Sequence, residues 1–203
     1  MNVHRLLLPL ALSALSLCAF AKAKQQANLT LFVGTYTQNS SSKGIYVYNF
    51  NQETSAFKLR STAQAGNPSF VAVSPNGKRL YAVSEFNDGQ QGAYSFDYDA
   101  KTGKLTNPIF ASTKAGDLQN EPENQPGSDP CNLFTDGQCL ITANYSGGDI
   151  SVFKLDKNGR LQGTPQQTRF QGRDAECVSH IHCGIRTPDG KHFLVTDLGN
   201  DRI

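Results

Sequence analysis

Short runs in which apolar and polar residues alternate, separated by turn residues, make up most of the chain beyond residue 30. The clearest is 44–50, GIYVYNF, where the apolar Ile45 and Val47 alternate with the more polar Tyr46 and Tyr48. A period of two predicts a strand with one buried face. Beyond the N-terminal segment, no stretch shows the apolar spacing of a helix of three turns. The pattern therefore predicts an all-β protein.

A block of strands and turns recurs along the chain. Its copies are PSFVAVSPNGKRLYAVSE at 68–85, PCNLFTDGQCLITANY at 130–145 and HIHCGIRTPDGKHFLVTDLG at 180–199, and their turn glycines are 60 and 53 residues apart. Repeats of this length are typical of β-propellers, in which each repeat is a four-stranded blade. A single blade cannot bury a core, so neighbouring blades must stack. The polar stretches 108–129 and 162–176 predict surface loops.

The N-terminus has the plan of a secretory signal peptide. A positive charge at Arg5 precedes an apolar run over 6–19, and small residues follow near position 21. We expect 1–21 to be removed on export to the periplasm or the medium, 22–29 to be a linker, and 30–203 to form the propeller domain. The run is too short for a comfortable membrane span, so after cleavage we expect no membrane association.

Composition narrows the choice of partners. The net charge is +2, and no basic stripe with interleaved aromatic residues occurs, which argues against nucleic acid as a partner. Four cysteines remain after the signal segment: Cys131, Cys139, Cys177 and Cys183. Export permits disulfides, so local pairs and free thiols both stay open.

The third copy of the block carries two histidines where the first copy has small polar residues. His180 aligns with Asn67, and His182 aligns with Ser69 and Cys131. Residues i and i+2 of a strand share a face, so both imidazoles should meet a ligand near the central axis. Either histidine can act as a general acid or base, or the pair can simply fix the strand opening. We expect no metal and no cofactor.

The bends after the second strand of each copy hold further candidates. Asn144, Asp197 and Asp201 could bind substrate hydroxyls, and Arg202 could bind an anionic group. The favoured interpretation, however, is a structural role in the bends, which need Gly and Asn for their turns.

An ordered series of motifs resembles one family. GTYT (34–37), GIYVYNF (44–50), NPSFVAVSPNGKRLYAVSE (67–85), PCNL (130–133), ANYSGGDISVFKL (143–155), HIHC (180–183) and DLGNDRI (197–203) are similar to the seven-bladed lactonase propellers. This family includes 6-phosphogluconolactonases and carboxymuconate cyclases, also called the cycloisomerase 2 family. The resemblance covers nearly all of the chain beyond the signal segment.

The resemblance implies hydrolysis or closure of a lactone ring on a small acidic substrate. The H-x-H segment of the family falls on His180 and His182, so His182 is our candidate catalytic residue. The family often has histidine where this chain has Asn132. Its G-P-R-H segment and a later glutamate do not occur in the 203 residues. We therefore expect about half of a propeller, poorly stable and inactive on its own.

Three alternatives follow from the same reading. A carboxymuconate-type cyclase would close rather than open the ring. A non-catalytic binding propeller of the cell envelope would not need the paired histidines. A calcium-dependent lactonase of another family would need acidic and amide side chains converging on the axis. The sequence leaves the lactone and the oligomeric state open.

Overall fold

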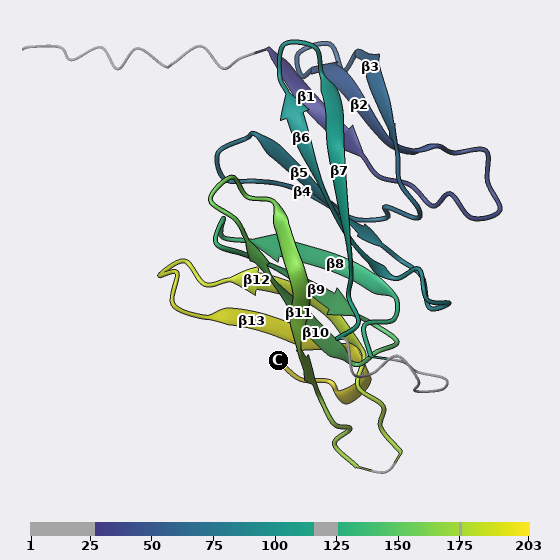
Figure 1. Ribbon diagram of the computed structural model, residues 1–203, viewed down its shortest axis with the longest axis vertical. Helices are drawn as coiled ribbons and strands as arrows, with labels where there is room; N and C mark the ends of the chain where they lie inside the picture. Colours follow the sequence, from purple (N-terminus) through teal and green to yellow (C-terminus); the bar gives the residue numbers. More distant parts are fainter. Residues whose placement is uncertain (1–26, 116–125, 175) are drawn as a thin grey trace, which may run out of the picture.

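The computed structural model describes residues 27–115, 126–174 and 176–203. The expected signal peptide, 1–21, and most of the expected linker lie outside these ranges. Over the described residues, thirteen strands form four antiparallel sheets that follow one another in chain order, from the purple N-terminal sheet to the yellow C-terminal one in Figure 1. No helix within them is long and apolar enough to cross a membrane. The prediction of an all-β fold built from successive sheets is confirmed.

The first sheet has three strands, in the order β1-β2-β3, and the second has four, in the order β4-β5-β6-β7. Their bounds are β1 Asn28–Val33, β2 Gly44–Asn51, β3 Phe57–Gln64, β4 Val71–Val73, β5 Arg79–Ser84, β6 Gly92–Asp99 and β7 Lys104–Ser112. Since β1 begins at Asn28, the last two residues of the expected linker belong to the first sheet.

The third sheet has four strands, in the order β8-β9-β10-β11, and the last has two, β12 and β13. Their bounds are β8 Pro130–Thr135, β9 Cys139–Asn144, β10 Asp149–Leu155, β11 Leu161–Arg169, β12 Ile181–Arg186 and β13 Phe193–Asp197, followed by a short 3-10 helix, η2, at Leu198–Asn200. Each copy of the repeated block thus supplies the first two strands of a sheet.

Two stretches that the sequence predicts as loops contain strands instead. The predicted loop at 108–129 overlaps the end of β7, and the one at 162–176 overlaps nearly all of β11. Both strands are the outer edges of their sheets. An edge strand tolerates proline, here Pro108 and Pro165, and can be largely polar because it is mostly exposed. Because of these features, a reading based on apolar alternation ends both edge strands too early.

Strand β5 explains why the sheets must stack. All six of its residues are buried. Leu80 and Ala82 pack toward Ile45 of the first sheet, and Tyr81 and Val83 pack toward the third sheet. A strand covered on both faces carries a continuous apolar run instead of a clean alternation. The core therefore lies between neighbouring sheets, as in a propeller.

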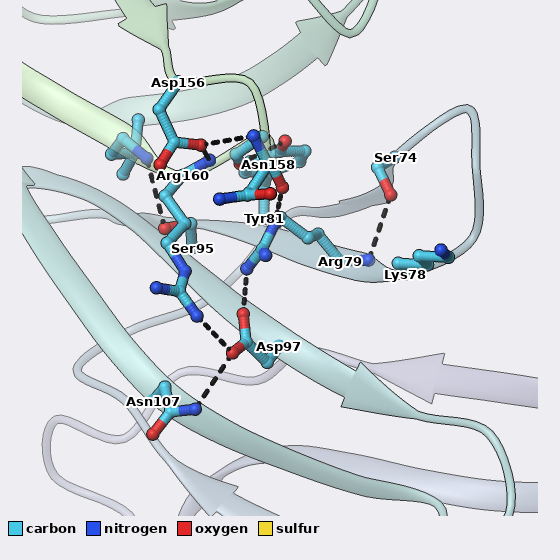
Figure 2. Close-up of polar contacts among 12 residues, drawn as sticks. Ser74, Lys78, Arg79, Tyr81, Ser95, Asp97, Asn107, Asp156, Asn158 and Arg160 are labelled. Atoms are coloured by element: carbon cyan, nitrogen blue, oxygen red, sulfur yellow. Dashed lines mark hydrogen bonds and ion pairs between the residues drawn. The ribbon is translucent and has the colours of Figure 1, made fainter.

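A polar network ties the second sheet to the third (Figure 2). Arg79 of β5 lies opposite Asp97 of β6 and forms an ion pair with it, although Arg79 is only 8% exposed. Arg160, which precedes β11, reaches the other carboxylate oxygen of Asp97 at 2.8 Å. The Tyr81 hydroxyl donates to the carbonyl of Gly159 at 2.7 Å. We call Arg79, Asp97 and Arg160 the inter-sheet ion network.

Candidate functional site

The histidine-bearing strand β12 and its counterpart β8 share a bulge. In the β8–β9 pairing the register skips Cys131, and in the β12–β13 pairing it skips His182. A β-bulge leaves one residue unpaired and re-aims its side chain. Ser69, just before β4, has the same place in the second sheet, because the N–H of Glu85 donates to the carbonyl of Asn67 as the N–H of Tyr145 donates to that of Asp129. The alignment of these three positions in the sequence is thus matched by their position in the sheets.

A second set of equivalent positions follows the second strand of each repeat. Glu85 follows β5 directly, and Tyr145 follows β9 directly. Extending the β1–β2 register beyond Val33 places Tyr36 at the same point of the first sheet. The two sets contact each other: the hydroxyl of Ser69 donates to Glu85, and the ring of His182 lies against the ring of Tyr145. They therefore border one surface of the stacked sheets.

The two histidines share Tyr145 as their neighbour. The His180 ring stacks on the Tyr145 ring with centroids 4.4 Å apart, and the His182 ring meets it edge-on at 5.6 Å. Nδ1 of His180 lies 3.1 Å from the carbonyl oxygen of Tyr145. Because a carbonyl only accepts, that nitrogen carries the proton in this arrangement. Both imidazoles therefore lie on one side of the strand, as the spacing predicts.

His182 is the more accessible of the two. It is exposed, whereas His180 is half-buried. Its Nδ1 lies 3.4 Å from the Sγ of Cys131, and Nε2 has no hydrogen-bond partner among the described residues. An imidazole held at one nitrogen and open at the other is the arrangement that proton transfer to or from a bound ligand requires.

Cys131 is a neutral thiol and not a nucleophile. Burial, followed by the negative charge of Glu85, raises the pKa of Cys131 to about 12. A thiol is nucleophilic only as the thiolate. Its sulfur lies 3.5 Å from the carbonyl oxygen of His182 and 3.7 Å from that of Ala143, so the thiol can donate to the backbone. The four cysteines Cys131, Cys139, Cys177 and Cys183 are all free.

A carboxylate that the sequence did not single out, that of Glu85, borders the same surface. Glu85 accepts hydrogen bonds from the hydroxyl of Tyr36, at 2.9 Å, and from the hydroxyl of Ser69. Burial and the hydrogen bond to Glu85 raise the pKa of Tyr36. The partners are 49 and 16 residues away along the chain, so only the alignment of the repeats could have brought Glu85 to notice.

Asn144 and Asp197 hold their sheets together. Asn144 is 0% exposed, and its Nδ2 donates to Asp149 at 2.5 Å and to Ser151 at 2.9 Å. Asp197 is 4% exposed and accepts from the hydroxyl of Ser179 at 2.7 Å. We correct the sequence-based expectation for these two side chains, because burial leaves them no surface to offer a substrate.

The carboxylate of Asp197 also helps to place a histidine. It accepts from the backbone N–H of His180 at 2.9 Å and from Nδ2 of Asn200 at 2.6 Å. Although burial opposes the charged form, these hydrogen bonds and that from Ser179 hold the pKa of Asp197 below its ordinary value. Asp197 therefore acts on the site through the backbone of His180.

The other two bend residues do not join the histidines. Nε of Arg202 lies 3.4 Å from a carboxylate oxygen of Asp197, and its NH2 donates to the carbonyl of Gln171 at 2.6 Å. Asp201 is exposed and adopts a left-handed conformation, with φ of 51°, just after η2. The structure brings together His180 and His182 and leaves these two outside that contact.

The surface around the two histidines is separate from two open hollows of the described structure. Open hollows of about 490 Å³ and 390 Å³ lie elsewhere, one lined by residues that include Thr37 and Tyr94, the other by residues that include Gly148 and Val178. Neither includes His180 or His182. Among the residues that the structure describes, no three His, Cys, Asp or Glu side chains are grouped as metal ligands.

Comparisons with known proteins agree with the repeat pattern. The family model described as "Lactonase, 7-bladed beta-propeller" matches residues 30–203. A 6-phosphogluconolactonase of Bacillus subtilis is 31% identical over 178 residues, which cover 85% of this chain and 47% of the relative. The chain thus spans about half the length of the curated relatives it matches.

Solved structures give the same result. A putative 6-phosphogluconolactonase from Bacteroides fragilis superposes with a TM-score of 0.76 at 37% identity, covering 88% of this chain and 48% of that one. A periplasmic gluconolactonase from Pseudomonas aeruginosa superposes with a TM-score of 0.70 at 29% identity, covering 85% of this chain and 48% of that one. About half of such a propeller is present here.

Proposed function

Because the chain belongs to the seven-bladed β-propeller lactonase family, we propose that the full-length protein hydrolyses a lactone of a sugar acid. The relatives named 6-phosphogluconolactonase support this reaction class. The observation that carries the proposal is the pair His180 and His182, gathered around Tyr145. The exposed ring of His182 is the group that meets the substrate.

In the proposed mechanism, His182 moves one proton twice. Nε2 takes a proton from a water molecule as the water oxygen bonds to the lactone carbonyl carbon. The bond from that carbon to the ring oxygen then breaks, and the same proton passes to the ring oxygen. The product is an open-chain hydroxy acid. This route needs Nδ1–H of His182 to point at the sulfur of Cys131, with the neutral thiol donating to a backbone carbonyl.

His180 and Asp197 act as positioning groups in this proposal. The stack of His180 on Tyr145 fixes the ring against which His182 packs. Asp197 holds the backbone N–H of His180 at the entrance to β12. Neither group needs to touch the lactone for the proton transfers to occur.

The test is His182→Ala in the full-length protein, assayed by the acid released from glucono-δ-lactone and from its 6-phosphate. General acid–base catalysis contributes about 100-fold to 10,000-fold, so we expect kcat to fall by that amount while KM changes little. His192→Ala, which removes an exposed histidine beyond the site, is the matched control. Wild-type turnover in the His182 variant would remove the assignment.

The same assay separates the alternatives. A carboxymuconate-type cyclase would form a lactone from a muconate and leave gluconolactones untouched. A binding propeller would turn over neither. Export is part of the proposal as well, supported by the secretory pattern at the N-terminus and by the word periplasmic in the name of one structural neighbour. Recovery of a mature protein that begins near residue 22 from the periplasm or medium would test it.

A further inference from the structure

Glu85 has an open hydrogen-bonding oxygen. Both of its hydroxyl donors, Tyr36 and Ser69, bond to the same oxygen, Oε2. Within the described ranges, Oε1 receives no hydrogen bond and no cation pairs with the carboxylate. An ionised carboxylate offers about four acceptor sites. Glu85 therefore has capacity beyond what the fold uses.

The groups around Glu85 face solvent. The Tyr36 side chain is 56% exposed, although its hydroxyl is fixed on Glu85, and Glu85 itself is only partly buried. Here an aromatic face and an acceptor oxygen are presented side by side.

The cluster borders the histidine site. Ser69 has the place in the second sheet that Cys131 and His182 have in the next two, and Glu85 has the place that Tyr145 has in the third. The charge of Glu85 acts on the thiol of Cys131, which lies 3.4 Å from His182. Cys131 therefore lies within electrostatic reach of Glu85 and in contact with His182.

We propose that Tyr36, Ser69 and Glu85 form a subsite that binds the hydroxyl groups of the sugar lactone, and this rests on the proposed function. Oε1 of Glu85 accepts a hydrogen bond from a ring hydroxyl, and the exposed face of Tyr36 packs on the C–H face of the sugar. The carboxylate repels a second anion, so a phosphate group on the substrate lies away from this subsite.

The test is Glu85→Gln in the full-length protein, with two six-membered lactones, one that carries hydroxyl groups and one that carries none. The glutamine keeps one oxygen that can accept from Tyr36 and Ser69. It replaces the other carboxylate oxygen with an NH2 group, which donates and does not accept. We expect KM for glucono-δ-lactone to rise about 10-fold to 100-fold, the range for hydrogen bonds to a charged group. We expect kcat to stay unchanged, as should both constants for δ-valerolactone, which has no hydroxyl groups.

Controls distinguish the outcomes. Glu53→Gln, in the exposed turn between β2 and β3, should leave kcat and KM unchanged for both lactones. Equal loss on both lactones, or a fall in kcat alone, would overturn the subsite and place Glu85 in the chemistry or the fold. Values of kcat and KM that stay unchanged for both lactones in Glu85→Gln would also overturn the subsite.

A binding measurement covers the case in which the wild type hydrolyses neither lactone. That result would remove the proposed function, and the subsite is then tested with D-glucitol, an uncharged polyol, by saturation-transfer NMR. Signal in the wild type that is lost in Glu85→Gln and kept in Glu53→Gln supports the subsite. Absence of signal in the wild type, or its persistence in Glu85→Gln, contradicts it.

Discussion

The inter-sheet ion network predicts an unequal dependence of stability on its two arginines. The side chain of Arg79 is 10% exposed and that of Asp97 is 24% exposed, whereas that of Arg160 is 38% exposed. Arg79 also donates from Nε to the carbonyl of Asn158 in the neighbouring sheet. The loss of Arg79 therefore removes a well-buried ion pair and a hydrogen bond between sheets, while the loss of Arg160 removes a partly hydrated ion pair between the same sheets.

The magnitudes follow from burial. Removal of one partner from a fully buried ion pair costs about 3–5 kcal/mol, and an exposed pair contributes about 0–1 kcal/mol. Since Asp97 keeps some contact with water, we expect about 2–3 kcal/mol for Arg79→Met and for Asp97→Asn. For Arg160→Met we expect about 0.5 kcal/mol. Asn107, which donates to Asp97 at 2.9 Å, is not substituted in any of the three variants.

The assay is urea unfolding of the full-length protein, followed by circular dichroism, for the three single variants and for the Arg79→Met/Asp97→Asn double variant. The double variant should lose less than the sum of its singles, with a coupling of about 1–2 kcal/mol. High salt should shrink only the small effect of Arg160. An Arg160 variant as unstable as the Arg79 variant, or an Asp97 variant within about 0.5 kcal/mol of wild type, would refute this reasoning.

Two further predictions concern backbone packing and pH. A Cβ on Gly34 would lie 1.9 Å from the carbonyl oxygen of Pro68, so Gly34→Ala should cost about 1–3 kcal/mol in urea unfolding; Gly77→Asn, at a left-handed turn position with nothing within 4 Å, should be nearly neutral. The raised pKa of Cys131, about 12, means that the folded state keeps a proton that the unfolded state loses near pH 9. The contribution of this thiol to stability is therefore complete below pH 9 and is lost progressively from pH 9 to about 12, an effect that Cys131→Ala should remove.

The fold could be predicted because each copy of the repeat carries the same local signals. The turn glycine Gly77 has a positive φ of 69° and Gly190 one of 71°, so the same tight turn joins the strands on either side. Burial of β5 on both faces then forces the sheets to stack. The four-stranded blade predicted the edge strands β7 and β11, but the sequence made them too short, because both strands are largely exposed and carry prolines.

The site was only half predictable, for a different reason. The spacing of His180 and His182 placed both on one face, and the structure agrees through Tyr145. The bulge at His182 has no signature in the apolar pattern, because a bulge is a shift of register between two strands. For Asn144 and Asp197 the sequence left both a structural role and substrate binding open, because it does not show whether a polar residue in a bend faces solvent or the interior; their burial favours the structural role.

The comparison of equivalent positions in the repeats supports the proposed site. The bulged positions of β8 and β12 have the same relation to their partner strands, yet one holds Cys131 and the other His182. Equivalent positions after β5 and β9 hold Glu85 and Tyr145. Turn glycines and core residues keep their type between copies because the backbone requires it. Positions that are equivalent in backbone geometry but different in chemistry are under no such constraint, so their side chains are free to be set by the ligand.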